Sequence, residues 1–220
     1  MMSKSQIDEL GKQLRQAATE GVALNVVALD AYRESFSNAI NDVQKMLQAA
    51  NLTEFTSRTK STASVVAKLL RQPKTRLSQV QDILGLRFVA DDLKQQEALM
   101  LELTRIFPDS KPLDRRLFPQ YGYRAVHLIV KVNGFPLEIQ VRSQLQHYWA
   151  QHSEMIADQR GQELKYGGGD VEIRRFLEKL SLEAAALEQQ PDQQPDQQDG
   201  RHTPEWLKDR FEKMIKKLST

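Results

Sequence analysis

A row of polar residues on a short predicted strand is the first feature that could carry chemistry. In the segment 137–142, apolar residues alternate with Glu138, Gln140 and Arg142. The two-residue period of a strand places this acid, amide and guanidinium on one face. Arg142 could then hold a phosphate through two hydrogen bonds, and Glu138 could bind a divalent metal or accept a proton. The pattern leaves open the alternative that this face of the strand is simply exposed to solvent.

A basic cluster precedes and enters a predicted helix. Arg58 and Lys60 lie just before the helix, and Lys68 lies about two turns along it. Cations near a helix N-terminus suit a polyphosphate, although a solvated basic face has the same pattern. Asp82, at the entry to the next predicted strand, could be a metal ligand or an acid in a turn.

An aromatic loop is the third candidate. The run Gly122-Tyr123-Arg124-Ala125-Val126-His127 presents a tyrosine immediately before a strand that carries His127. A tyrosine in such a loop can stack on a nucleobase, a contact worth roughly 1–3 kcal/mol. The ring could equally cover the hydrophobic core.

The elements that position these residues follow from hydrophobic periodicity. Apolar steps of three and four predict helix over 6–51, with a break near Gly21 that divides it into two helices. The turn Asn133-Gly134 predicts a hairpin, so the strands on either side of it are antiparallel neighbours. The other predicted elements are an extended segment 52–58, helices 62–71, 93–106, 144–158 and 171–187, and strands 83–90, 124–132 and 137–143.

The C-terminal part has a different composition. The repeated PDQQ tract predicts a flexible linker over 189–202, since it has little apolar surface to bury. A basic amphipathic helix is predicted over 203–220, with Trp206, Leu207 and Phe211 among the residues of its apolar face. This pattern favours docking on the domain or on a partner subunit. Contact with RNA or another anionic partner is the alternative.

Composition excludes several classes of function. The 220 residues carry 31 Lys and Arg against 29 Asp and Glu, so the net charge of +2 favours no class of partner. The absence of cysteine excludes disulfides, thiolate metal sites and a cysteine nucleophile. No signal-peptide pattern or long apolar run occurs, so we expect a soluble cytoplasmic protein with no membrane partner. The four histidines form no His-Asp or His-x-x-x-His pair, which argues against a metal hydrolase.

The order and spacing of these motifs resemble the synthetase domain of the RelA/SpoT family, and within it the small alarmone synthetases. The similarity covers about residues 50–155, and we assign the domain to 51–188 and a separate helical region to 1–50. The motifs that carry it are Arg58-x-Lys60 with Lys68, Asp82-x-x-Gly85-x-Arg87, Gly122-Tyr123-Arg124-x-Val126-His127, Glu138-Ile139-Gln140-Val141-Arg142, and His147 with Trp149.

The resemblance implies an α/β (α+β) fold, with a mixed, mainly antiparallel, nucleotidyltransferase-like sheet flanked by helices. It implies a Mg²⁺-dependent pyrophosphokinase that transfers the β,γ-diphosphate of ATP to the ribose 3′-hydroxyl of GTP or GDP, making (p)ppGpp and AMP. It further implies a homo-oligomer.

Individual roles come from the same resemblance. Asp82 and Glu138 match the two acids that hold Mg²⁺, and Glu138 matches the group that activates the attacking hydroxyl. The residues that match the ATP-binding positions are Arg58, Lys60, Lys68 and Arg87. Those that match the acceptor pocket are Tyr123, which would stack on the base, and His127, Gln140 and Arg142.

The loop before the Gly-Tyr pair departs from the family pattern. A lysine and an asparagine usual in members that use GTP or GDP are missing, Tyr121 stands at the asparagine position, and Arg115 and Arg116 add charge. The alternative is therefore a toxin that pyrophosphorylates the 3′-CCA end of tRNA, with an antitoxin protein as its partner. A second alternative is an inactive nucleotide sensor, against which the retention of Asp82 and Glu138 argues.

Overall fold

The computed structural model describes residues 2–189 and 204–219. Within it the chain forms two compact units. The first comprises the chain up to Arg87 together with 106–111 and 128–140, and the second comprises 88–105, 112–127 and the chain from Val141 onward. The predicted linker 189–202 lies, apart from Gln189, outside the described residues.

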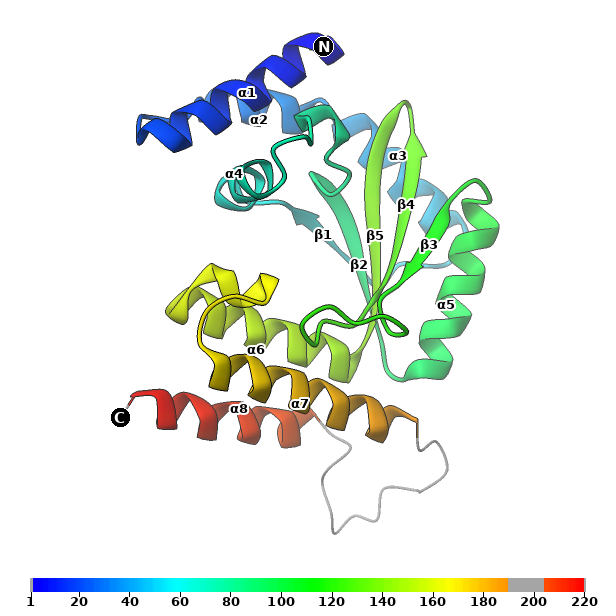
Figure 1. Cartoon of the computed structure of the whole chain (residues 1–220). Coiled ribbons are helices and arrows are strands. Elements are labelled where there is room, and N and C mark those ends of the chain that lie inside the picture. The colour runs from blue at the N-terminus through cyan, green and yellow to red at the C-terminus, as the bar shows by residue number, and fades with distance from the viewer. Residues whose placement is uncertain (1, 190–203, 220) are drawn as a thin grey trace. The chain divides into compact units, whose positions relative to one another are not determined.

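Five strands form one sheet in the order β1-β2-β5-β4-β3. The mixed, mainly antiparallel α/β fold class is confirmed (Figure 1). Asn133 and Gly134 have positive φ values of 51° and 84°, as the predicted hairpin turn between β4 and β5 requires. The strands are β1 (Phe55–Thr59), β2 (Leu84–Ala90), β3 (Lys111–Asp114), β4 (Val126–Val132) and β5 (Phe135–Ser143).

Strand β3 was not predicted from the sequence. Its four residues include Pro112, and most of them are exposed, so the alternating apolar pattern that marks a half-buried strand is absent. Strand β3 is an edge strand of the sheet, and edge strands are where proline is tolerated.

The N-terminal region contains three helices, so the prediction of two was wrong. These are α1 (Lys4–Glu20), α2 (Val26–Glu34) and α3 (Ser37–Ala49). The break at Gly21 is confirmed, but a second one falls at Ser35 and Phe36. Phe36 is fully buried and continues the apolar stripe across that break. The hydrophobic periodicity is therefore not interrupted there, and it predicted one helix where the structure has two.

Helix α4 (Thr62–Arg71) packs against α1 in the first unit. The Arg15 side chain on α1 donates to the carbonyl oxygens of Leu69 and Thr75 at 3.0 and 2.9 Å. These bonds hold the C-terminal end of α4 and the segment that leads to the short helix η1 (Leu77–Gln79). They therefore stabilise the helix that carries Lys68.

The second unit contains most of the C-terminal helices. They are α5 (Leu93–Ile106), α6 (Gln144–Arg160), α7 (Val171–Glu188) and α8 (Pro204–Ser219), with the short helix η2 (Gln162–Tyr166). Figure 1 shows α6, α7 and α8 side by side, and a shared apolar core joins them.

The predicted docking of the C-terminal helix on its own domain is confirmed. Phe211 of α8 is fully buried, its ring stacks on His152 of α6 at 4.8 Å, and it meets Phe176 of α7 edge-on. On the outer side of α8, Lys213 pairs with Asp209, and Lys208 lies 4.0 Å from Glu212. The basic face is therefore interspersed with acids.

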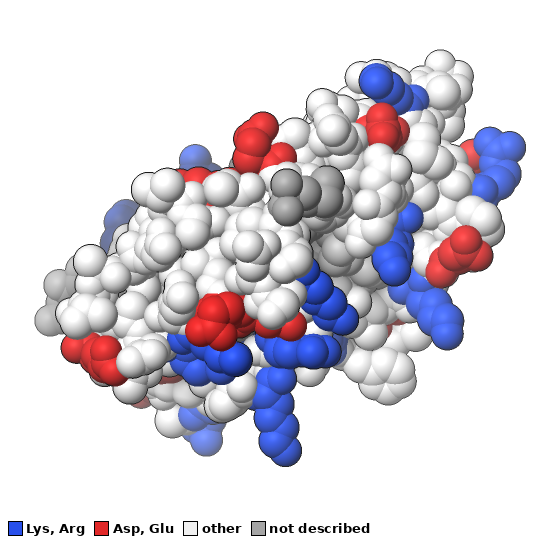
Figure 2. Space-filling model, turned by 90° about the horizontal axis from the view of Figure 1, so that it is seen from above, with Lys and Arg blue, Asp and Glu red and all other residues white. Residues whose placement is uncertain are grey.

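Charge is mixed elsewhere as well. Figure 2 shows basic and acidic side chains interspersed over the face that it displays. Among the residues that the structure describes, no helix combines the length and the apolar character needed to cross a bilayer.

Candidate functional site

Asp82 is held between two lysines in the first unit. Lys60 follows β1, and its backbone N–H donates to the carbonyl oxygen of Ile83 at 2.9 Å, which fixes it beside the entry to β2. Lys60 Nζ lies 2.8 Å from one Asp82 carboxylate oxygen, and Lys68 Nζ lies 2.9 Å from the other. Ser61 caps α4 by accepting from the N–H of Ser64, so the helix that carries Lys68 starts at a defined residue. We call Asp82, Lys60 and Lys68 together the Asp82 cluster.

The cluster sets the protonation state of its acid. Burial of Asp82 opposes ionisation, but the charges and hydrogen bonds of Lys60 and Lys68 outweigh it and lower the pKa of the carboxyl to about 2. Asp82 is therefore ionised at neutral pH, and two cations are held close to it.

Glu138 on β5 has partners of its own in the same unit. Gln140 Nε2 donates to Glu138 Oε2 at 2.6 Å, and Arg58 lies 3.8 Å from the same oxygen. Gln140 was predicted to line the acceptor pocket, but the structure places it against the acid. The exposed-face alternative for this strand is wrong, because only 3% of Gln140 and 2% of Arg142 are exposed.

Gly85 sets the position of Glu138. A Cβ atom added to Gly85 would lie 2.1 Å from the backbone carbonyl oxygen of Glu138, which is far inside van der Waals contact. The motif therefore requires glycine at this position because β2 and β5 approach closely there. Arg87 lies two residues further along β2 and is half-buried.

The two acids suit Mg²⁺ by their chemistry. Mg²⁺ prefers oxygen ligands and commonly takes one or two carboxylates, with substrate phosphates and waters completing its shell. In the described part of the chain no three His, Cys, Asp or Glu side chains gather into a metal site. Asp82 and Glu138 are the residues that would hold the metal, with substrate phosphates and waters as the further ligands.

A second cluster lies in the second unit and consists of Tyr123, His127 and Arg142, which we call the Tyr123 cluster. The Tyr123 hydroxyl lies 2.9 Å from His127 Nε2 and accepts from an Arg142 nitrogen at 3.0 Å. The Arg142 guanidinium also lies over the tyrosine ring, 5.1 Å from its centroid. These contacts hold the ring in one orientation.

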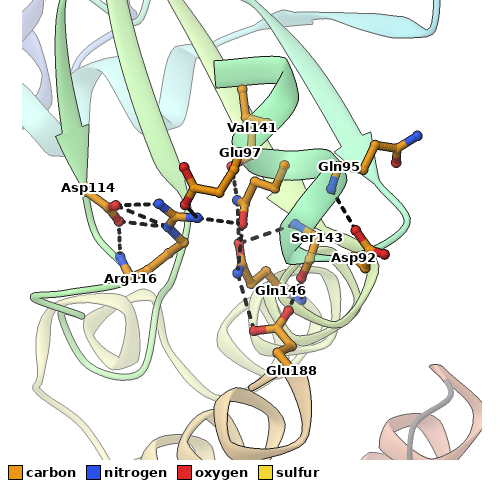
Figure 3. A network of polar contacts seen from close by, with 10 residues as sticks. Asp92, Gln95, Glu97, Asp114, Arg116, Val141, Ser143, Gln146 and Glu188 are labelled. Carbon is orange, nitrogen blue, oxygen red and sulfur yellow. Dashed lines mark hydrogen bonds and ion pairs between the residues drawn. The ribbon is translucent and has the colours of Figure 1, made fainter. Parts of the chain in front are cut away.

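Arg116 is paired with acids of its own unit. Its guanidinium is 2.6 Å from Asp114 and 2.7 Å from Glu97, and it donates to Gln96 at 3.2 Å (Figure 3). The hydrogen bond to Asp114 is the main reason that the pKa of Arg116 is raised. The charge that Arg116 adds to the loop is therefore accompanied by two carboxylates.

The network around Arg116 continues into α6 and α7. Gln96 donates to the Val141 carbonyl oxygen and to Gln146, and Gln146 donates to Glu188 (Figure 3). Ser143 also donates to Glu188. Burial raises the pKa of Glu188 even though these donors oppose the shift. Sequence reasoning missed this network, because single polar residues on helices leave no pattern that marks them as partners.

Comparison with known proteins identifies the central region. Residues 57–157 match a family model described as a region found in RelA / SpoT proteins. Uncharacterized proteins of Mycobacterium bovis and Mycobacterium tuberculosis are 40% identical over 114 residues, which make up 50% of this chain and 42% of each relative. The chain thus spans about two fifths of the length of the curated relatives it matches.

Solved structures share the fold. Small alarmone synthetase 1 from Bacillus subtilis, bound to its product pppGpp, has a TM-score of 0.58 at 22% identity, covering 71% of this chain and 90% of that one. The same protein bound to AMPCPP has a TM-score of 0.51 at 19% identity, with the same coverage. A GTP pyrophosphokinase family protein from Streptococcus pneumoniae has a TM-score of 0.51 at 20% identity, covering 83% and 93%.

Gly85→Ala tests the close approach of β2 and β5. The added methyl group must displace the Glu138 backbone, so we expect a loss of about 1–3 kcal/mol in the free energy of unfolding, measured by urea titration. Val89→Ala, at an exposed position of the same strand, is the control and should cost less. Equal stability of Gly85→Ala and the unaltered protein would contradict the packing.

The Asp82 cluster predicts a specific acid dependence. Because the folded pKa of Asp82 is about 2 and its ordinary value is 3.8, its contribution to stability is complete above about pH 5 and is lost as the pH falls toward and below 2. The loss is roughly 2 kcal/mol. Asp82→Asn should be less stable than the unaltered protein at neutral pH. Its stability should also lack the pH-dependent contribution of the Asp82 carboxyl. Urea unfolding across pH 2–6 measures the free energy of unfolding at each pH, with Asp109→Asn at an exposed position as the control. Parallel pH curves for Asp82→Asn and the unaltered protein would contradict the prediction.

Proposed function

We propose that the chain is a Mg²⁺-dependent pyrophosphokinase, because its residues 57–157 match the region found in RelA / SpoT proteins. The reaction moves the β,γ-diphosphate of ATP to the ribose 3′-hydroxyl of GTP or GDP. A bond forms between the 3′-oxygen and the β-phosphorus, the bond from the β-phosphorus to the oxygen of the α-phosphate breaks, and AMP leaves. The observation that carries the proposal is the pairing of both acids with cations in the first unit.

The proposed reaction depends mainly on positive charge around the transferred diphosphate. Transfer of a phosphoryl-type group depends on charge stabilisation and on alignment more than on covalent help from the protein. Lys60, Lys68 and Arg58 are the cations that would bind the ATP phosphates, and each already lies near a carboxylate. Mg²⁺, held by Asp82 and Glu138, would neutralise further charge on the diphosphate.

Glu138 is the residue that we propose takes the proton of the 3′-hydroxyl. Its side chain is largely buried, and Gln140 and Arg58 both face Oε2. The hydrogen bond from Gln140 orients the carboxylate. A general base must be held within hydrogen-bonding reach of the proton that it accepts.

Tyr123 is the residue that would stack on the acceptor base. Arg142 lies over the ring, and the partly buried ring also packs against the hydrophobic core of the second unit, so a base would stack on the part of the ring that stays exposed. The likeness to a small alarmone synthetase solved with pppGpp and with AMPCPP supports nucleotides as both substrates.

The tRNA 3′ end is a second candidate acceptor, because the loop before Tyr123 exposes an apolar pair. Leu117 is 71% exposed and Phe118 is 77% exposed. Exposed aromatic rings can stack on the bases of a single strand.

One experiment separates these acceptors. The purified protein receives Mg²⁺ and γ-labelled ATP with GDP, GTP or deacylated tRNA in parallel, and a chelator control removes the metal. We expect label in GDP or GTP, and none when Mg²⁺ is chelated. Label in tRNA alone would establish the toxin instead. ATP binding without transfer to any acceptor would establish the inactive sensor.

Glu138→Gln tests the proposed base and metal ligand. The amide keeps the size of the side chain but can neither accept the proton nor supply a charged ligand, so we expect transfer to fall at least ~100-fold. Glu54→Gln, at an exposed position of the same unit, should keep normal transfer. Circular dichroism and thermal unfolding verify the fold of both variants. Unchanged turnover by Glu138→Gln would contradict the assignment.

Tyr123→Ala and Tyr123→Phe together test stacking. Loss of the ring should raise KM for the acceptor about 5- to 150-fold with little effect on KM for ATP, because stacking is worth roughly 1–3 kcal/mol per base. Tyr123→Phe keeps the ring and should have a much smaller effect. An equal rise in both KM values for Tyr123→Ala would make Tyr123 a residue of the core instead.

A further inference from the structure

The segment that carries Tyr123 is hydrogen-bonded to one hydroxyl group on α7, that of Ser181. Ser181 Oγ donates to the carbonyl oxygen of Gly122 at 2.5 Å and accepts from Arg124 Nε at 3.2 Å. The residues on both sides of Tyr123 are therefore bound to the same atom. Ser181 is only 3% exposed, so water has little access to replace these bonds.

Arg124 extends this attachment to the start of the loop. One of its terminal nitrogens donates to the Arg116 carbonyl oxygen at 2.8 Å, while its Nε donates to Ser181. The Arg116 side chain is in turn held by Asp114 and Glu97 (Figure 3). The Arg124 guanidinium, which contacts Ser181 of α7, thus helps to close the loop 116–124, together with the backbone hydrogen bond from Arg115 N–H to the Ala125 carbonyl oxygen at 2.9 Å.

Gly122 has no room to move toward the helices. Its φ of +85° lies in the left-handed region, and a Cβ there would come within 2.7 Å of the Trp149 ring and 3.2 Å of the Leu177 carbonyl oxygen. The Trp149 Nε1–H donates to that same carbonyl at 2.9 Å, so both groups are fixed. A cavity of about 10 Å³, lined in part by Gly122, Arg124 and Ser181, holds at most about one water.

These contacts complement those at the other end of the tyrosine. His127 and Arg142 hold the hydroxyl of Tyr123, whereas Ser181 and Arg124 hold the backbone on either side of it. A stacking surface that is already oriented loses less conformational freedom when a base binds, which raises affinity without a new contact.

We propose that Ser181 is a positioning residue for acceptor binding, acting through Gly122 and Arg124 on the orientation of the Tyr123 ring. The inference rests on the proposed function in so far as Tyr123 receives the acceptor base. Ser181 is 3% exposed and bonds only to the backbone of Gly122 and the side chain of Arg124 among the contacts described above, so we expect its effect on the acceptor side of the reaction.

Ser181→Ala removes the hydroxyl and leaves the Gly122 carbonyl unpaired. We expect KM for GDP or GTP to rise roughly ten-fold, since loss of a partner to a buried polar group has an effect of this order. KM for ATP and kcat should stay within about two-fold, because the hydrogen bonds of Ser181 go to Gly122 and Arg124, beside Tyr123, and not to a residue proposed to bind ATP. Ser181→Thr keeps the hydroxyl and should restore most of the acceptor affinity.

Ser153→Ala is the matched control. Ser153 lies on α6 in the same unit, and its hydroxyl donates only to a carbonyl of its own helix, that of Ala150. The same chemical change there should leave both KM values unaltered. If Ser181→Ala raises the KM values for ATP and acceptor equally, or behaves as Ser153→Ala does, the positioning role is overturned.

Hydrogen exchange without substrate tests the attachment independently of activity. In Ser181→Ala the amides of 116–125 should exchange roughly ten-fold faster, while those of α6 keep their rates. Unchanged exchange in that segment overturns the inference whether or not the protein is active. Failure of the unaltered protein to transfer label to any acceptor would refute the proposed function alone, because exchange would still report the attachment.

Discussion

Strand β5 buries charged and polar side chains together with its apolar ones, and each buried charge must then find a partner. Glu138 is met by Arg58 and Gln140, and Arg142 is met by Tyr123. The neighbouring Asp82 obeys the same requirement through its two lysines. Within the first unit this pairing also holds the acids beside the cations that the proposed reaction uses, and within the second unit it holds the aromatic ring. The requirements of folding and those of the chemistry are met here by the same contacts.

The Asp82 cluster pairs opposite charges before any nucleotide binds. Two lysine side chains face one carboxylate, which is ionised at neutral pH because its pKa is about 2. A polyphosphate brings negative charge for the lysines, and a divalent cation brings positive charge for the acid. Binding both together therefore exchanges one set of opposite charges for another, which keeps the cost of desolvating the cluster low. Binding either alone would leave one kind of charge without a counterpart.

In the second unit the stacking residue depends on helices remote from it in sequence. Trp149, Leu177 and Ser181 of α6 and α7 form the surface against which the Gly122–Arg124 segment lies. These helices also bury the apolar face of α8, so the C-terminal helix is part of the same packed unit. A loop with exposed apolar residues at its tip can be well ordered at its base because it rests on this surface.

Local patterns in the sequence determined the strands and helices that carry the candidate acids and cations, the hairpin at Asn133-Gly134 and the apolar face that docks α8, because strand period, helix period and turn chemistry are properties of short segments. The tertiary structure alone decided that Gln140 serves Glu138, that Arg116 is bound by Asp114 and Glu97, and that β3 joins the sheet. It also decided the contact of Ser181 with Gly122, which lies 59 residues away. Contacts of this kind join single polar atoms across long stretches of chain, and no periodicity or motif records which atoms will meet.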